Sequence, residues 1–150
     1  MFSESFLSPI GPISIIANDD AITHVKFESI ENNPNKITHE AIHQLQHYFN
    51  KKLESFHLPI ELHGTPFQIS VYELLREIPY GTTLTYHALA TRFGNKNAIR
   101  AVAAANARNP LPILIPCHRV IGVDGKLIGY LGGISAKKYL LLLENKYQLF

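Results

Sequence analysis

The sequence has a single cysteine, Cys117, and no apolar run long enough to cross a bilayer. One cysteine excludes an intramolecular disulfide and is compatible with a reducing compartment. No lysine or arginine precedes Lys26, so the basic region that opens a secretory signal is missing. The apolar residues 10–17 are interrupted by Gly11 and Pro12 and are too short for a membrane span. We therefore expect a soluble, cytoplasmic protein with no membrane partner.

Charge is scarce and unevenly distributed along the chain. The net charge is +2 and 17% of residues are charged, whereas a hydrophobic content of 46% is ample for a core. Residues 1–64 carry four lysines against eight acids, and residues 65–150 carry ten basic residues against four acids. The basic second half indicates a polyanionic partner, although mutual attraction of the two halves would explain the same pattern.

The first 62 residues are predicted to form a small unit of strands and one helix. Residues 13–16 and 22–27 are β-rich, and the turn-forming residues 18–20 between them favour a hairpin. From Thr38 onward, apolar residues recur at helical spacing. Residues 58–62 alternate between apolar and other residues, which predicts a further strand.

Helix signals dominate the second half. Residues 65–68 (TPFQ) combine a threonine cap, an early proline and a capping-box glutamine, and residues 79–81 (PYG) end the predicted helix. Thr85 caps a second helix and Gly94 is placed to end it, while residues 98–108 form a third helix. The second and third helices, joined by a short polar turn, indicate a helix-turn-helix.

The third helix is rich in alanine, so its backbone can approach another surface closely. That surface is either the protein's own core or DNA. The basic residues Arg92, Lys96 and Arg100 nearby would suit phosphates.

Cys117 lies in an apolar segment, residues 111–121, that is predicted to be a buried strand or extended stretch. A lone cysteine is most often a small buried hydrophobe, and a nucleophilic role requires the thiolate. His118 is adjacent, but neighbours on an extended chain point to opposite faces, so a bridging water or a local turn would be required. Glu144, on a last helix predicted to be capped by Ser135, could orient a histidine or simply be solvated.

Several motifs occur together in the order and spacing of one known family. They are residues 65–68, 78–81, 85–86, 100–102, 109–110, 115–120 (IPCHRV), 129–130, 132–133 and Glu144. This set resembles the O⁶-alkylguanine-DNA alkyltransferases, also called methylated-DNA–protein-cysteine methyltransferases, strongly over residues 65–145 and more weakly before them. A collinear set of this kind is far more specific than one short motif.

The resemblance implies a ribonuclease-H-like α/β domain over residues 1–62 and a mainly helical domain with a helix-turn-helix over residues 63–150. It implies a DNA repair enzyme that flips O⁶-alkylguanine, chiefly O⁶-methylguanine, out of double-stranded DNA. The alkyl group then passes irreversibly to the protein's own cysteine, once per molecule. No cofactor is implied, because the damaged base is the alkyl donor, and the expected form is a monomer bound in the minor groove.

The resemblance also implies roles for the reacting residues. Cys117 matches the nucleophile, His118 the base that acts through a water, and Glu144 the acid that orients this base. Asn109 matches a hinge asparagine whose side chain ties down backbone near the site. Tyr86 matches a tyrosine that helps to rotate the nucleotide and donates a proton or hydrogen bond to guanine.

Further residues are expected to contact DNA or the base. Arg100 matches an arginine finger that fills the space left by the flipped nucleotide, and Ala101 and Ala104 permit close approach to the groove. Arg119 is expected as a further DNA contact. The expected substrate pocket includes Val120, Tyr130 and Leu131, of which Leu131 is larger than the residue usual there.

Some family members bind zinc in the first domain through cysteines and histidines, but this chain has no cysteine there, so no metal site is predicted. His39, His43 and His47 recur every fourth residue, which favours a solvated stripe over adventitious metal binding. The main alternative function is a non-catalytic, alkyltransferase-like lesion-binding protein, although such relatives lack the cysteine. A helix-turn-helix transcription factor and a cysteine hydrolase are the remaining alternatives.

Overall fold

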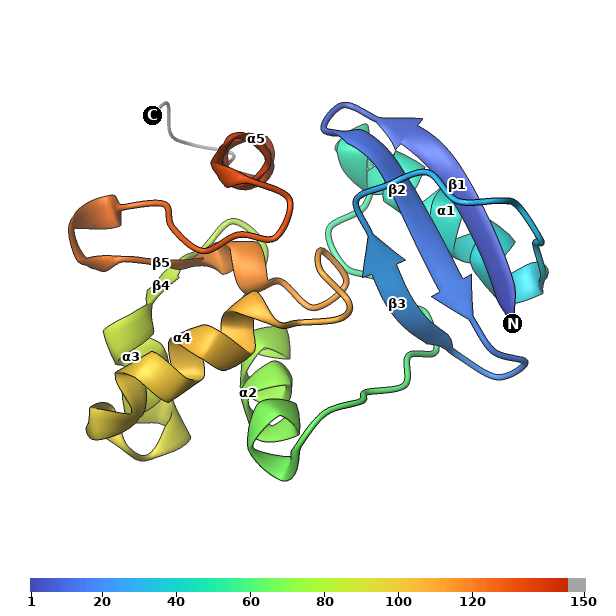
Figure 1. The fold of residues 1–150 in the computed structure, drawn as a ribbon. Coiled ribbons are helices and arrows are strands. Elements are labelled where there is room, and N and C mark those ends of the chain that lie inside the picture. Colours follow the sequence, from blue (N-terminus) through green and yellow to red (C-terminus); the bar gives the residue numbers. More distant parts are fainter. Residues whose placement is uncertain (146–150) are drawn as a thin grey trace. The chain divides into compact units, whose positions relative to one another are not determined.

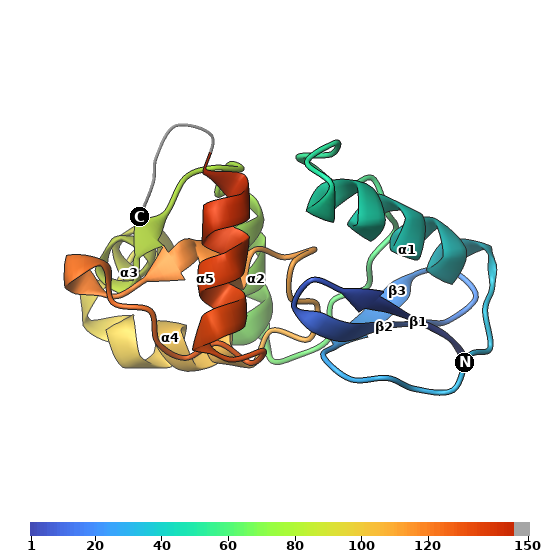
Figure 2. The ribbon, with the colours of Figure 1, turned by 90° about the horizontal axis from the view of Figure 1, so that it is seen from above.

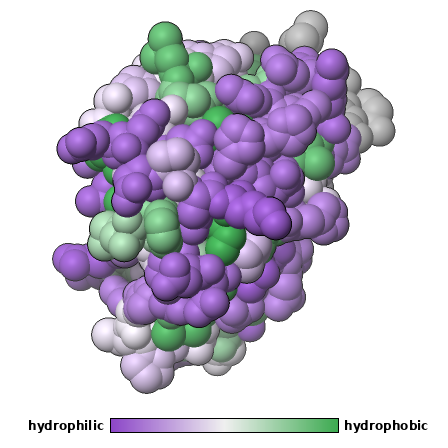
Figure 3. All heavy atoms as spheres, turned by 90° about the vertical axis from the view of Figure 1, so that its right-hand side faces the viewer, coloured by the Kyte–Doolittle hydropathy of each residue, from purple (hydrophilic) through white to green (hydrophobic). Residues whose placement is uncertain are grey.

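The computed structural model describes residues 1–145, and the chain divides into two compact units, Met1–His63 and a second that begins at Gly64 (Figure 1). No helix among the described residues combines the length and apolar character that a membrane crossing demands. The molecular face drawn in Figure 3 is largely hydrophilic, and its apolar side chains are scattered over it.

The first unit is a three-stranded antiparallel sheet with a helix packed against it (Figures 1 and 2). The strands are β1 (Phe2–Ser8), β2 (Gly11–Ala17) and β3 (Ile22–Lys26), in the order β1-β2-β3. The predicted hairpin of β2 and β3 is confirmed. Strand β1, which the sequence patterns did not predict, pairs with β2 along its whole length.

Helix α1 (Lys36–Phe49) begins at a capping box in which Asn35 and Thr38 exchange side-chain hydrogen bonds with each other's backbone. Its buried residues recur at helical spacing and face the sheet, which confirms the predicted helix; they are Thr38, Ala41, Ile42, Leu45, Tyr48 and Phe49.

Residues 58–62 do not form the strand that their alternating pattern predicted. That prediction is wrong, because only one isolated bridge forms, between Ile22 and Ile60. Pro59 has no N–H with which to extend a ladder, so it contributes only its carbonyl, which accepts a hydrogen bond from Ile22 N–H.

The three histidines of α1 do not meet at one point. The Nε2 atoms of His43 and His47 lie 3.1 Å apart, whereas His39 Nδ1 lies 3.5 Å from the Glu4 carboxylate.

As far as residue 145, the second unit is built from four helices and a two-stranded parallel pair (Figure 1). The helices are α2 (Pro66–Arg76), α3 (Tyr86–Phe93), α4 (Ile99–Ala107) and α5 (Ile134–Glu144), and the strands are β4 (Leu84–Thr85) and β5 (Val120–Ile121). Short 3₁₀ turns occupy Lys96–Ala98, Cys117–Arg119 and Val123–Gly125.

Local capping explains where these helices begin and end. The predicted capping box of Thr65 and Gln68 starts α2, and the Thr85 hydroxyl caps α3. Gly94 ends α3 with φ of +102°, a conformation that glycine adopts without strain. Helices α3 and α4, joined through Gly94 and the turn Lys96–Ala98, form the predicted helix-turn-helix.

The last helix differs from its prediction in two respects. Ser135 lies inside α5 and does not cap it, because the chain enters the helix through Gly133, which has φ of +93° and no capping side chain. Leu140, Leu141 and Leu143 are buried as expected, but Leu142 is 38% exposed.

Candidate functional site: a cysteine beside a buried His–Glu–Arg cluster

Cys117, His118 and Arg119 form a 3₁₀ turn, and all three side chains are buried. The expectation of an extended chain through Cys117 is therefore wrong. Backbone hydrogen bonds make the turn: Cys117 N–H donates to Ile115 O at 2.8 Å, and Arg119 N–H donates to Pro116 O at 3.1 Å. With three residues per 3₁₀ turn, successive side chains are separated by about 120° and no longer point to opposite faces. The local turn that a Cys117–His118 partnership requires is thus present.

The Asn109 side chain holds the segment that leads into this turn. Its Nδ2 donates to Ile115 O at 2.8 Å, and its Oδ1 accepts from Leu111 N–H at 2.9 Å. Asn109 is 2% exposed, so both hydrogen bonds are shielded from water. The segment in between includes Ile113 at φ of +74°, an uncommon conformation for a β-branched residue.

The carboxylate of Glu144, on the last turn of α5, joins two neighbouring residues of the cysteine turn. Its Oε2 accepts from His118 Nε2 at 2.7 Å and from Arg119 Nη2 at 3.0 Å, and its Oε1 accepts from Arg119 Nε at 2.7 Å. Burial raises the pKa of Glu144, but its two partners outweigh burial and lower the pKa to about 2. Glu144 is therefore ionised at neutral pH.

His118 presents a buried, neutral imidazole held by Glu144. Burial lowers its pKa, so the imidazole is neutral at pH 7. Because Nε2 lies against a carboxylate, Nε2 carries the proton and Nδ1 keeps its lone pair. Among residues 1–145, no group forms a hydrogen bond with this Nδ1.

The Cys117 thiol rests in its protonated form. It is 4% exposed, and burial raises its pKa to about 11, against the opposing influence of the Asn109 amide and the Lys137 charge. A base must therefore remove the thiol proton as the sulfur attacks.

Lys137, on α5, is a residue of this site that the sequence analysis missed. It is fully buried, and its Nζ donates to Val120 O at 2.6 Å, to Ile128 O at 3.0 Å and to the Tyr86 hydroxyl at 3.5 Å. Burial lowers its pKa to about 8. A signal was available: Lys137 precedes the buried Leu140, Leu141 and Glu144 by three, four and seven residues, so it shares their face of the helix.

The predicted pocket residues separate into buried and exposed ones. Val120 and Tyr130 are buried, and the Tyr130 ring lies edge-on to His118 with centroids 6.5 Å apart. Tyr86 is also buried and its hydroxyl donates to Ile128 O at 3.1 Å. Leu131, in contrast, is 65% exposed, so its side chain is not part of the buried cluster.

The residues predicted to contact DNA also divide into exposed and buried ones. Arg100, Ala101 and Ala104 lie on the exposed face of α4. Arg119 is only 7% exposed, and its remaining Nη1 donates to Ile78 O at 2.7 Å. Glu144 and this carbonyl hold its guanidinium, so Arg119 is an internal anchor of the site, and its contact with DNA stays a prediction.

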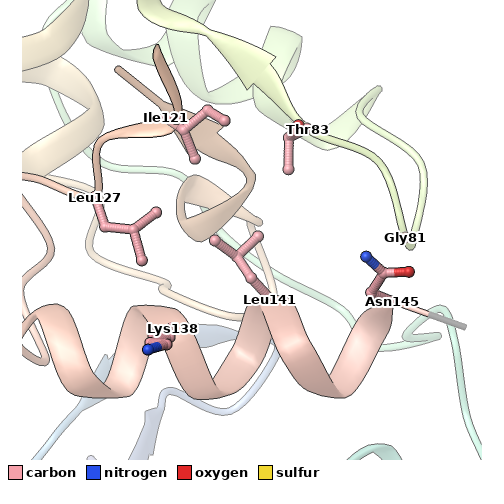
Figure 4. Close-up of a pocket in the computed structure, with 8 residues that line it drawn as sticks. Gly81, Thr83, Ile121, Leu127, Lys138, Leu141 and Asn145 are labelled. Carbon is pink, nitrogen blue, oxygen red and sulfur yellow. The ribbon is translucent and has the colours of Figure 1, made fainter. Parts of the chain in front are cut away.

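A separate apolar pocket of about 280 Å³ lies between β4, β5 and α5 (Figure 4). The residues that line it are Gly81, Thr83, Ile121, Gly125, Leu127, Lys138, Leu141 and Asn145. It contains none of the predicted site residues.

Fold and site together define a class: a helix-turn-helix protein with a buried cysteine next to a histidine–carboxylate pair. The family model for the ribonuclease-like domain of 6-O-methylguanine DNA methyltransferase matches residues 1–62, and the model for its DNA-binding domain matches residues 66–146. The chain belongs to the 6-O-methylguanine DNA methyltransferase family.

Individual relatives are similar in sequence to this chain over nearly its full length. A methylated-DNA–protein-cysteine methyltransferase of Methanosarcina barkeri is 47% identical, with 97% of this chain and 98% of the relative covered. The corresponding protein of Haemophilus influenzae is 41% identical, over 92% of this chain and 83% of the relative. The crystal structure of the Mycobacterium tuberculosis O⁶-methylguanine methyltransferase has a TM-score of 0.89 at 37% identity, covering 99% and 94% of the two chains. A complex of this mycobacterial protein with DNA has a TM-score of 0.90 at 39% identity, covering 97% and 93%.

Proposed function

We propose that this protein repairs DNA by transferring an alkyl group from O⁶ of a damaged guanine to Sγ of Cys117. The observation that carries the proposal is the buried turn Cys117–Arg119, in which the sole cysteine is followed at once by a neutral histidine that Glu144 fixes. The names of the relatives, and the DNA complex of the mycobacterial protein, support the same reaction.

The proposed reaction uses His118, Cys117 and Glu144 together. His118 Nδ1, which has no hydrogen-bond partner among the described residues, takes the thiol proton through a water while Sγ attacks the alkyl carbon. The S–C bond forms, the C–O⁶ bond breaks, and the bonding pair stays on the guanine, which becomes neutral by taking a proton from the Tyr86 hydroxyl. The thiol proton held by His118 passes to solvent, and solvent reprotonates Tyr86. Glu144 stabilises the imidazolium that forms, as carboxylates do in triads. The thioether does not revert, so each molecule reacts once, and the base itself supplies the alkyl group without a cofactor.

DNA recognition is proposed to use the exposed face of α4. A base inside a duplex must be flipped before chemistry, at a cost of a few kcal/mol. Arg100 would fill the vacated stack, and Ala101 and Ala104 would allow close approach to the minor groove by a monomer. Burial raises the pKa of Tyr86, so its hydroxyl stays protonated. It can donate to the flipped guanine by exchanging its hydrogen bond to Ile128 O for one to the base, with Tyr130 lining the pocket.

Mass spectrometry tests the proposal. After mixing with duplex DNA that carries O⁶-methylguanine, the peptide with Cys117 should gain one methyl group, saturating at one per protein. The variant Cys117→Ala should bind the lesion and gain none. A wild-type protein that binds the lesion but stays unmodified would instead be a non-catalytic lesion-binding protein.

A further inference from the structure

The side chain of Asn106 lies next to the reacting cysteine and is only half satisfied. It is on the inward face of α4 and 2% exposed. Its Nδ2 donates to the backbone carbonyl of Cys117 at 3.4 Å. Within the described residues 1–145, its Oδ1 is buried and accepts no hydrogen bond. A hydrogen bond from the same amide also opposes the rise in pKa that burial causes at Tyr86, so Asn106 borders two residues of the site.

An unsatisfied amide oxygen in this position is costly. A buried polar group without a partner is unfavourable, and asparagine is also a weaker helix former than alanine. Most neighbours of Asn106 along α4 are alanines, namely Ala103, Ala104, Ala105 and Ala107. An acceptor kept at such a site is expected to gain its donor from a bound water or from a ligand.

We propose that Asn106 Oδ1 accepts a hydrogen bond from the 2-amino group of the flipped base, which makes Asn106 a specificity-determining residue; this rests on the proposed alkyl transfer. O⁶-alkylation leaves N1 of guanine without a hydrogen, so the 2-amino group supplies the only N–H donors of the base. That group shares the Watson–Crick edge with O⁶, the edge by which flipped bases are read. The hydrogen bond to the Cys117 carbonyl fixes which end of the amide remains available.

The proposal predicts which damaged bases are disfavoured. O⁶-methylhypoxanthine lacks the 2-amino group, and O⁴-methylthymine has no N–H at all. Each would leave Oδ1 unsatisfied, which corresponds to a loss of about tenfold to a hundredfold in transfer rate.

The test compares second-order rate constants for methyl transfer to Cys117 from duplexes carrying O⁶-methylguanine or O⁶-methylhypoxanthine. The wild-type protein should favour guanine by at least about tenfold. Asn106→Leu keeps the volume but removes the acceptor, so the guanine rate should fall until the ratio of the two rates approaches one. Asn106→Asp keeps an acceptor, so the ratio should persist even if both rates fall. Arg108→Ala, exposed at the end of the same helix, is the control and should leave the ratio unchanged.

Other outcomes overturn the proposal in distinguishable ways. A wild-type ratio near one, or an undiminished ratio in Asn106→Leu, would show that Asn106 does not read the amino group, while transfer itself stands. Equal loss of both rates in Asn106→Leu, with an unchanged circular dichroism spectrum, would show a role in the site that is independent of the base. If neither duplex methylates the wild-type protein, the proposed function fails as well.

Discussion

Replacing Arg119 by methionine should destabilise the protein without weakening its hold on DNA phosphates. The guanidinium makes two hydrogen bonds to Glu144 and one to Ile78 O, all within 3.0 Å, and the Glu144 side chain is 2% exposed. Removing one partner of a buried ion pair leaves the other charge buried without compensation, which typically lowers the free energy of unfolding by about 3–5 kcal/mol. That is a large fraction of the roughly 5–15 kcal/mol that stabilises a typical domain.

Urea unfolding followed by far-ultraviolet circular dichroism measures this cost, because four of the five helices among the described residues lie in the second unit. The double variant Arg119→Met/Glu144→Gln should be more stable than the sum of the single costs predicts, by about 2 kcal/mol. Costs that add to within about 0.5 kcal/mol would refute the coupling inferred from the geometry.

Salt-dependent DNA binding separates an internal anchor from a phosphate contact. Each phosphate contact contributes about 0.9 to the slope of log affinity against log salt. Arg119→Met should leave the slope unchanged, whereas Arg92→Ala, an exposed residue of the helix-turn-helix, should reduce it without loss of stability. A reduced slope in folded Arg119→Met would place Arg119 in the DNA interface.

The remaining predictions concern Arg100 on the exposed face of α4 and two buried residues of the site, Lys137 and Glu144. Arg100→Ala should slow repair of duplex DNA more than reaction with free O⁶-alkylguanine, and equal slowing of both would reject the finger role. Lys137→Met should slow methyl transfer at least about tenfold and shift alkylation of Cys117 by iodoacetamide to higher pH, since the lysine charge lowers the thiol pKa; an unchanged profile would contradict this. The pKa of Glu144 falls from 4.5 to about 2 on folding, so about 3 kcal/mol of stability, present above pH 4.5, should be lost as the pH falls towards 2. Acid titration of Glu144→Gln should lack this loss, and parallel curves for the two proteins would count against it.

The sequence alone predicted the features that depend on near neighbours. Thr65 with Gln68, Thr85, and Gly94 set helix ends because a cap satisfies backbone groups within one turn. The helix-turn-helix, the β2–β3 hairpin and the apolar face of α1 follow from such local signals and from helical or alternating spacing. The motif around Cys117, together with the order of the other motifs, was sufficient to identify the family.

Only the tertiary structure decided how the reacting groups meet, because those contacts join residues far apart in the chain. The partnership of Glu144 with His118 and Arg119 spans about 25 residues, and it makes Arg119 a buried anchor of the site. Long-range hydrogen bonds likewise placed Lys137 in the site, since nothing local shows which carbonyls a buried lysine will reach. The failed strand over residues 58–62 has the same origin, because a strand exists only when a partner lies alongside to pair with its backbone.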